Sequence, residues 1–298
     1  MKKFIGNSLA AIALTLAVSN SVLAGPIILG GDDLTDHGSF NGTNNLEGWL
    51  YIEKAISNLL GSQTRGGSIT TNIAALGSAS STATSANAGA AIGSAASELG
   101  KTVSYFEGAA AINQFFVDLA AGVVNPSVIW LAGTGAANDL DTAEGLALTA
   151  NALAINSFVS SGGGLMSHGS GDVAYGWLTA LLPGLTAVDG CNSNGATLTA
   201  AGNAAFPGLS NSDVDANAGP CHNYFAGDFG GLVTLAFDGS STPRSYIIGG
   251  GADTVIQCGQ QDQPPCPTQV PEPSALPLFA LAFLGMLGVM RRKQGKVN

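Results

Sequence analysis

The sequence predicts an α/β domain with a mainly parallel sheet, because short apolar runs alternate with helical patterns along its middle. The clearest apolar run, residues 127–133, has the composition of a strand that is buried on both faces. A polar loop follows it, and then a long helical pattern at residues 142–159 that three glycines end. Strands that alternate with helices in this way indicate β-α-β units, whose strands are parallel.

The other predicted elements repeat this alternation on both sides of that run. Residues 26–30 form an apolar strand ending in Gly30, and residues 48–61 carry apolar side chains at helical spacing. Residues 66–100 are rich in Ala, Ser, Thr and Gly, and we interpret them as packed structure rather than a linker. In chain order, the remaining elements are strand 69–76, helix 86–99, strand 102–106, helix 109–121, strand 165–169, a helix after Asp172 to Leu182, and a hairpin of strands 232–237 and 245–249.

The two ends of the chain have the sequence patterns of targeting segments. Residues 1–24 have a basic start, an apolar centre and the small-residue pattern of a cleavage site before Gly25, which is typical of a secretory signal peptide. Residues 275–290 carry no charge and, as a helix, would rise about 24 Å, so they can just span a membrane. The basic residues 291–293 should stay on the cytoplasmic side. We therefore expect a transmembrane sorting helix near the C-terminus.

The C-terminal order of Val-Pro-Glu-Pro, apolar helix and basic end resembles the PEP-CTERM proteins of Gram-negative bacteria. The resemblance implies that exosortase removes the tail near Pro271, Glu272 and Pro273, with Arg291 and Arg292 forming the basic end. It also implies signal peptidase and exosortase as processing enzymes, transient contact with the inner membrane, and release or attachment at the cell surface, often beside exopolysaccharide. The predicted domains are a signal peptide at 1–24, an α/β domain at 25–251, a Gln/Pro-rich spacer at 252–269 and the sorting signal at 270–298.

The exported part is strongly acidic and carries four cysteines. Between residues 25 and 270 there are 4 basic and 19 acidic residues, which gives a formal charge of −15. This charge excludes binding to nucleic acid through electrostatic attraction. Cysteines in an exported chain predict disulfides. Four cysteines allow three pairings, and we favour the two that each close a local loop. These pairs are Cys191 with Cys221 and Cys258 with Cys266.

A glycine-rich segment around His168 supplies the candidate catalytic residues. The run Gly162-Gly163-Gly164-Leu165-Met166-Ser167-His168-Gly169-Ser170-Gly171 resembles the class I glutamine amidotransferase-like fold, nearest to its trehalose-utilisation-like branch. That resemblance implies a flavodoxin-like three-layer sandwich. No cysteine lies before Cys191, so the family's nucleophile is missing and we expect no glutaminase activity.

An alternative nucleophile is a serine at the turn after the predicted strand. Such a turn holds the residue above the sheet, beside helix amides. In this hypothesis Ser170 attacks, His168 is the base and Asp172 orients it. Ser167, His222 and Asp228 are the alternatives for these three roles. The competing interpretation is that His168 hydrogen-bonds at a polar strand end while the serines cap the next helix.

A second group of polar residues follows the predicted parallel strands, whose carboxyl ends meet at one edge of the sheet. Ligands bind at that edge in open α/β sheets, and carboxylates and amides there suit sugar hydroxyls or calcium. The candidate binding residues are Asp32, Asp33, Asp36, His37, Asn138, Asp139, Asp141 and His222. We expect an exported cell-surface or extracellular-matrix protein that is non-catalytic and binds glycan or calcium. The alternatives are a secreted hydrolase of carbohydrate or ester, and a structural matrix protein.

Overall fold

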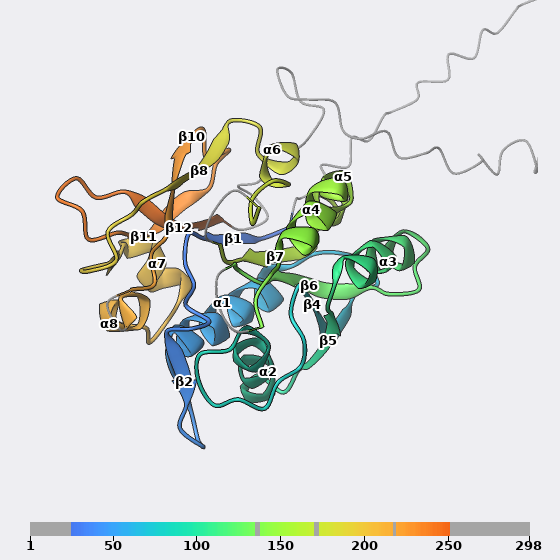
Figure 1. The fold of residues 1–298 in the computed structure, drawn as a ribbon, viewed down its shortest axis with the longest axis horizontal. Coiled ribbons are helices and arrows are strands. Elements are labelled where there is room, and N and C mark those ends of the chain that lie inside the picture. Colours follow the sequence, from blue (N-terminus) through green and yellow to red (C-terminus); the bar gives the residue numbers. More distant parts are fainter. Residues whose placement is uncertain (1–24, 135–137, 170–172, 217–218, 251–298) are drawn as a thin grey trace, which may run out of the picture.

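The computed structural model describes residues 25–134, 138–169, 173–216 and 219–250. One sheet runs through the described part, with helices on both of its faces (Figure 1). Half of this sheet is parallel: β5 pairs with β4, β4 with β6, β6 with β7, and β7 with β1. The five strands are β1 (Ile27–Gly30), β4 (Ile69–Leu76), β5 (Thr102–Phe106), β6 (Pro126–Leu131) and β7 (Gly164–Ser167).

The other half of the sheet is antiparallel and comes mostly from the C-terminal part of the domain. It continues from β1 through β12 and β10 to β8, while β11 pairs with β12 and β9. A separate hairpin of β2 and β3 precedes the first helix. These strands are β2 (Gly38–Phe40), β3 (Asn45–Glu47), β8 (Leu185–Asp189), β9 (Thr197–Leu198), β10 (Asn223–Gly227), β11 (Val233–Phe237) and β12 (Ser245–Gly250).

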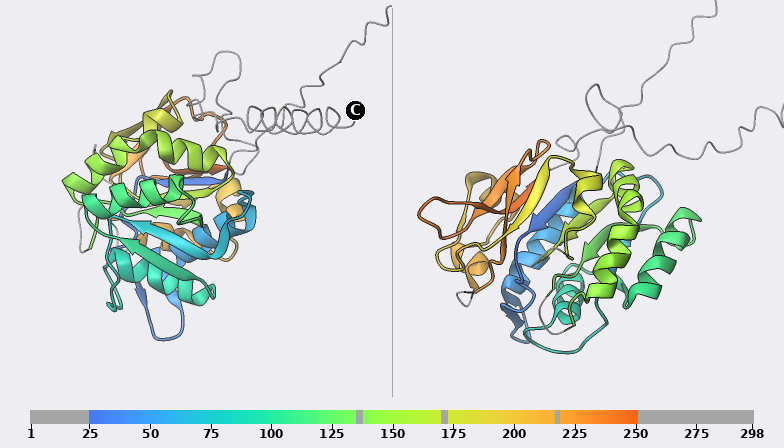
Figure 2. Two further views of the ribbon diagram at one scale, coloured as in Figure 1. Left: turned by 90° about the vertical axis from the view of Figure 1, so that its right-hand side faces the viewer. Right: turned by 45° about the horizontal axis from the view of Figure 1, so that its top comes forward.

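The helices form two outer layers, which the turned views separate (Figure 2). On one face α1 packs against α2, α7 and α8, and on the other α3 packs against α4, and α5 against α6. The helices are α1 (Gly48–Ser62), α2 (Ala88–Glu98), α3 (Ala109–Ala120), α4 (Thr142–Ala150), α5 (Ala152–Ser160), α6 (Leu178–Leu181), α7 (Ala200–Ala205) and α8 (Asn211–Val214).

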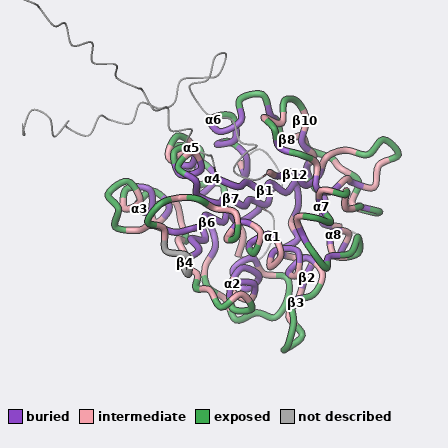
Figure 3. The backbone as a smooth tube through the Cα atoms, turned by 180° about the vertical axis from the view of Figure 1, so that it is seen from behind, coloured by how far each residue is buried: buried purple, intermediate pink, exposed green. Residues whose placement is uncertain are grey.

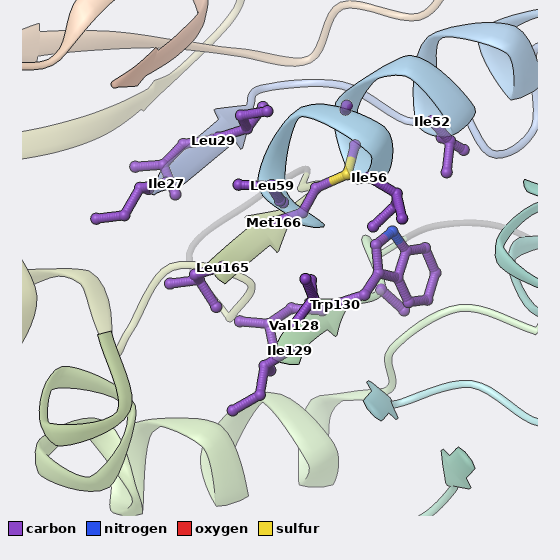
Figure 4. Close-up of a cluster of buried hydrophobic side chains, with 14 of the residues drawn as sticks. Ile27, Leu29, Ile52, Ile56, Leu59, Val128, Ile129, Trp130, Leu165 and Met166 are labelled. Carbon is purple, nitrogen blue, oxygen red and sulfur yellow. The ribbon is translucent and has the colours of Figure 1, made fainter. Parts of the chain in front are cut away.

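The core lies between the sheet and these layers, so the buried backbone runs through the centre of the molecule (Figure 3). Side chains of α1, such as Ile52 and Ile56, face Met166 and Trp130 of the sheet (Figure 4). Ile129 points to the opposite face, as the alternation of a strand requires. Full burial of one such aliphatic side chain stabilises the fold by about 1.5–3 kcal/mol.

The strand order differs from the flavodoxin-like order that the sequence analysis predicts. That order is 2-1-3-4-5 when the parallel strands are numbered along the chain. Here the first strand, β1, lies beside β7 at the far side of the parallel half, so the order is 3-2-4-5-1. The two arrangements coincide in space if β1 takes the place of the fifth strand. The layers are therefore those of an α/β sandwich, but the first strand of the chain occupies the position that the fifth strand has in the flavodoxin-like order.

Most predicted elements are present, and two predicted helices need correction. The pattern at 142–159 forms two helices that meet at Asn151, whose side-chain amide and backbone amide both donate to the Ala147 carbonyl. The predicted helix after Asp172 is reduced to α6, since the described residues before it form turns. Sequence reasoning also missed β2, β3, β8, β9, β10, α7 and α8, which are short or polar.

The described helices are all too short or too polar to cross a bilayer. The predicted signal peptide, spacer and sorting helix lie outside the described residues, as do Cys258 and Cys266. The predicted pairing of Cys191 with Cys221 is confirmed.

Candidate functional site

The loops after β1 and β7 meet at the carboxyl edge of the sheet and form a buried acid–imidazole pair. His168 Nδ1 lies 2.6 Å from Asp32 Oδ1, and both side chains are 0 % exposed. The amide of Gly169 donates to the Asp32 carbonyl at 2.9 Å, which joins the two loops through their backbones as well. Parallel pairing of β1 with β7 explains the meeting, because it places the two strand ends side by side.

Aromatic rings close this pair off on the side of α1. The Tyr51 ring meets the imidazole edge to face at 6.2 Å, and the Trp130 ring lies 5.5 Å from it. Burial, with a contribution from the charge of Asp32, raises the pKa of Tyr51 well above its ordinary value, so this phenol stays neutral. A Cβ on Gly30 would lie 1.6 Å from Asp32 Oδ2, so this position must be glycine for the carboxylate to fold back over β1.

Several polar atoms of this buried cluster have no hydrogen-bond partner within the described residues. They include Asp32 Oδ2, His168 Nε2 and the Tyr51 hydroxyl. Buried polar groups are normally paired, and unpaired ones mark positions where a protein keeps polar chemistry at a cost in stability. The imidazole is therefore oriented by Asp32 through Nδ1, which leaves Nε2 as its second polar atom.

A second acid–imidazole group lies one residue further along the loop and reaches the surface. Asp33 Oδ2 is 2.7 Å from His222 Nε2, and Asp33 Oδ1 is 3.3 Å from His37 Nε2. His222 is 41 % exposed and His37 21 %, so a dissolved molecule can contact both imidazoles. One carboxylate thus stands between two accessible rings, and we call Asp33, Asp36, His37 and His222 the edge cluster.

The charges of the edge cluster shift one another's pKa values. Burial tends to raise the pKa of Asp33, but hydrogen bonds from His222 and His37 outweigh it and lower that pKa. Hydrogen bonds to Asp33 raise the pKa of His37 and of His222. Burial, together with the charge of Asp33, raises the pKa of Asp36 to about 6. The cluster therefore binds protons more readily at Asp36, His37 and His222 than these side chains would in water.

The disulfide loop brings His222 to this edge. Cys191 follows β8 and Cys221 precedes β10, so the bond joins the ends of two paired strands. Cys221 forms a backbone bridge with Asp32, and the His222 amide donates to the Gly31 carbonyl at 2.8 Å. A Cβ on Gly31 would lie 2.0 Å from the Asn223 carbonyl oxygen, so glycine allows the two loops to touch.

Asn138 and Asp141, two of the predicted binding residues, lie on the loop after β6 and make structural hydrogen bonds. Asn138, at φ 64°, accepts a hydrogen bond from the Ala79 amide and donates to the Ala79 carbonyl, which ties this loop to the one after β4. Asp141 caps α4 in a capping box with Glu144. Asp139 lies between these two on the same loop. The described contacts of Asn138 and Asp141 therefore do not join them to Asp33.

Of the predicted catalytic residues and their alternatives, the structure describes His168 and Ser167 but not the other members of the favoured set. Ser170 and Asp172 lie outside the described residues. Ser167 Oγ donates to the Tyr175 hydroxyl at 3.3 Å, and that hydroxyl donates to the Gly30 carbonyl, so Ser167 is part of the core rather than a nucleophile. The carboxylate that orients His168 is Asp32, which sequence reasoning placed in the binding set. Its position two residues after a strand parallel to that of His168 is the signal that could have linked them.

The buried pair and the edge cluster differ in their exposure to solvent, and this difference decides which of them can contact a ligand. The buried pair joins a carboxylate and an imidazole at 2.6 Å, and His168 is 0 % exposed. The edge cluster offers hydrogen-bond acceptors on Asp33 and Asp36 and donors on His37 and His222 to a polar ligand. Within the described residues, no three His, Cys, Asp or Glu side chains are arranged to hold a metal ion.

Comparison with known proteins bears on the C-terminal end of the chain. Residues 269–293 match the PEP-CTERM protein-sorting motif. The motif marks an exported protein that exosortase sorts to the cell envelope or surface. Neither a curated protein nor a solved structure matches the chain.

Proposed function

We propose that this is an exported surface protein whose tail exosortase removes near Pro271-Glu272-Pro273. The observation that carries the proposal is the sorting motif at residues 269–293. The Cys191–Cys221 bond in the folded domain supports it, because structural disulfides persist in oxidising compartments. Release from the membrane or attachment at the surface then leaves the α/β domain outside the cell, where its charge keeps it soluble.

The sorting step can be tested in a Gram-negative host that expresses exosortase. A C-terminal epitope tag should disappear from the mature protein, and the Glu272→Ala variant should keep its tag and stay in the membrane fraction. Glu98→Ala, at an exposed residue of α2, is the matched control and should be processed normally. Complete processing of the Glu272→Ala variant, or retention of the tag by the unmodified protein, would contradict the proposal.

For the domain itself, the best-supported activity is binding of a polyhydroxyl ligand such as an exopolysaccharide, without catalysis. Support comes from the edge cluster, where the Asp33 carboxylate lies between His37 and His222 at the edge of the sheet that ligands use. Sugar hydroxyls can donate to a carboxylate and accept from an imidazole at once. The buried Asp32–His168 pair beneath the cluster fixes the loop that presents Asp33.

Binding can be measured by co-sedimentation of the protein with the host's exopolysaccharide. Asp33→Asn and His222→Gln should each lower the bound fraction, while Glu98→Gln on α2 should not. Parallel assays with calcium and with a chelator test the calcium hypothesis: equal binding in both would count against a bridging calcium ion. Equal binding by Asp33→Asn and the unmodified protein would remove the edge cluster from the proposal.

A hydrolase is the second candidate, and the orientation of His168 favours it. Asp32 holds Nδ1 and leaves Nε2 as the atom that could accept a proton from Ser170. Turnover of short carbohydrate esters that is lost in Ser170→Ala, with unchanged thermal stability, would establish this activity. Equal turnover by the variant would exclude Ser170 as the nucleophile.

A further inference from the structure

The first described residue, Gly25, is docked into the domain. Its amide nitrogen donates to the Val159 carbonyl oxygen at 2.6 Å, and Gly25 is itself buried. The next residue, Pro26, accepts a hydrogen bond from the Leu165 amide at 2.9 Å, which places it at the start of β7. The position where the signal peptide is expected to end is therefore part of the packed fold.

The partner of Gly25 is the C-terminal end of α5. This helix ends in a Schellman motif: the Gly163 amide donates to the Phe158 carbonyl, and the Gly162 amide to the Val159 carbonyl. Gly162 has the positive φ, 93°, that the motif requires. The Val159 carbonyl thus accepts from both Gly162 and Gly25, and it lies where the helix dipole is negative.

This helix end has no cation of its own. α5 contains no charged residue, and none of the residues in its last turn is basic. A cation from another part of the chain, Arg65, lies beside this end, with its guanidinium carbon 4.9 Å from the centre of the Phe158 ring. That side chain stacks on the ring and has no carboxylate partner among the described ion pairs. A positive charge at the Gly25 nitrogen would instead lie directly on a carbonyl of this helix end, 2.6 Å from the Val159 oxygen.

We propose that Gly25 is the mature amino terminus and that its α-ammonium group caps the C-terminal end of α5. Signal-peptide removal after Ala24 breaks one peptide bond by hydrolysis and turns the Gly25 amide into an ammonium group at the same place. The amide hydrogen bond to Val159 becomes charge-assisted, which is the stronger form. Export thus adds a positive charge to a hydrogen bond that the precursor already makes. This inference rests on the proposed export of the chain.

Glycine is the residue that allows this docking. A Cβ at position 25 would lie 1.9 Å from the Gly163 carbonyl oxygen, closer than any side chain can approach a backbone atom. A different residue at the first mature position would keep the signal peptide cleavable but would push the terminus away from α5. Glycine at position 25 therefore allows the amino terminus to pack against the end of α5.

The test compares chains that differ at their first residue. Residues 25–298 are released from a cleavable fusion in an oxidising host, one version starting at Gly25 and a second retaining Ala24. Both keep the donor to Val159, but only the first places the charge there. The version starting at Gly25 should melt about 1–4 °C higher at pH 6.5, from the usual size of a charge–dipole contact. An α-amino group titrates near pH 8, so this advantage should vanish by about pH 9.5.

Two outcomes separate the parts of the proposal. Mass spectrometry of the exported full-length protein should give Gly25 as the first residue, and a different first residue would overturn the assignment of the mature terminus. Equal melting temperatures of the two purified versions at pH 6.5 would overturn the ammonium cap, whatever the result for export. Gly25→Ala in the purified protein should lower the melting temperature at every pH, because the clash with Gly163 does not depend on charge.

Discussion

The buried Asp32–His168 pair allows a sharp test of what holds the carboxyl edge together. His168→Gln leaves the Asp32 carboxylate inside the protein without its imidazole, and both side chains are 0 % exposed. Removing one partner of a buried charged pair typically costs about 3–5 kcal/mol. For a domain of about 150–250 residues each kcal/mol lowers Tm by about 2–4 °C, so we expect a fall of about 6–20 °C.

The assay is thermal unfolding followed by circular dichroism, with His222→Gln as the matched control. His222 also contacts an aspartate at 2.7 Å, but it is 41 % exposed, so its loss should cost less than about 1 kcal/mol. The double variant Asp32→Asn/His168→Gln should be less destabilised than the sum of the single variants, because the two residues are in contact. A fall in Tm for His168→Gln no larger than for His222→Gln would refute the reasoning.

The remaining predictions concern the surroundings of this pair. Because the pKa of Asp36 is raised from 3.8 to about 6, the folded state binds its proton more readily than the unfolded state, and stability should fall as pH rises from about 4 to 6; the raised pKa values of His37 and His222 should extend the fall above pH 6.5, and Asp36→Asn should reduce only the part below pH 6 in thermal scans. Reduction of the Cys191–Cys221 bond, which closes a loop of 30 residues, should cost about 3–4 kcal/mol in urea unfolding, and an unchanged midpoint would contradict this. Gly31→Ala should lower Tm because the new Cβ would clash with the Asn223 carbonyl. Gly61→Ala in α1 is the control and should not lower Tm, because a Cβ there would have no atom within 4 Å.

Sequence patterns predicted the parallel half of the domain well. The strands β1, β6 and β7 lie where apolar runs predicted them, because a strand buried on both faces is apolar along its length, and β4 and the edge strand β5 also lie where strands were predicted. In the antiparallel half the predicted hairpin is confirmed as β11 and β12, but β8, β9 and β10 were missed. β8 and β10 are partly exposed and polar, so their sequences carry no continuous apolar run.

The candidate site was predicted as a set of residues but not as a set of contacts. Asp32, Asp33, His37, His168 and His222 do gather at the carboxyl edge. Their partners could not be read from the chain, because neighbouring residues at a strand end point in different directions. Asp32 turns inward to His168, and Asp33 turns outward to His222.

The sequence by itself indicated export of the protein and the positions of its buried strands, since sorting motifs and apolar runs act locally. Tertiary structure alone decided that β1 lies beside β7 rather than beside β4, and that the disulfide loop reaches across to Gly31. Those choices depend on which of several apolar strands pack together over long chain separations. The pattern of one strand does not name its neighbour, and the site exists only where the neighbours meet.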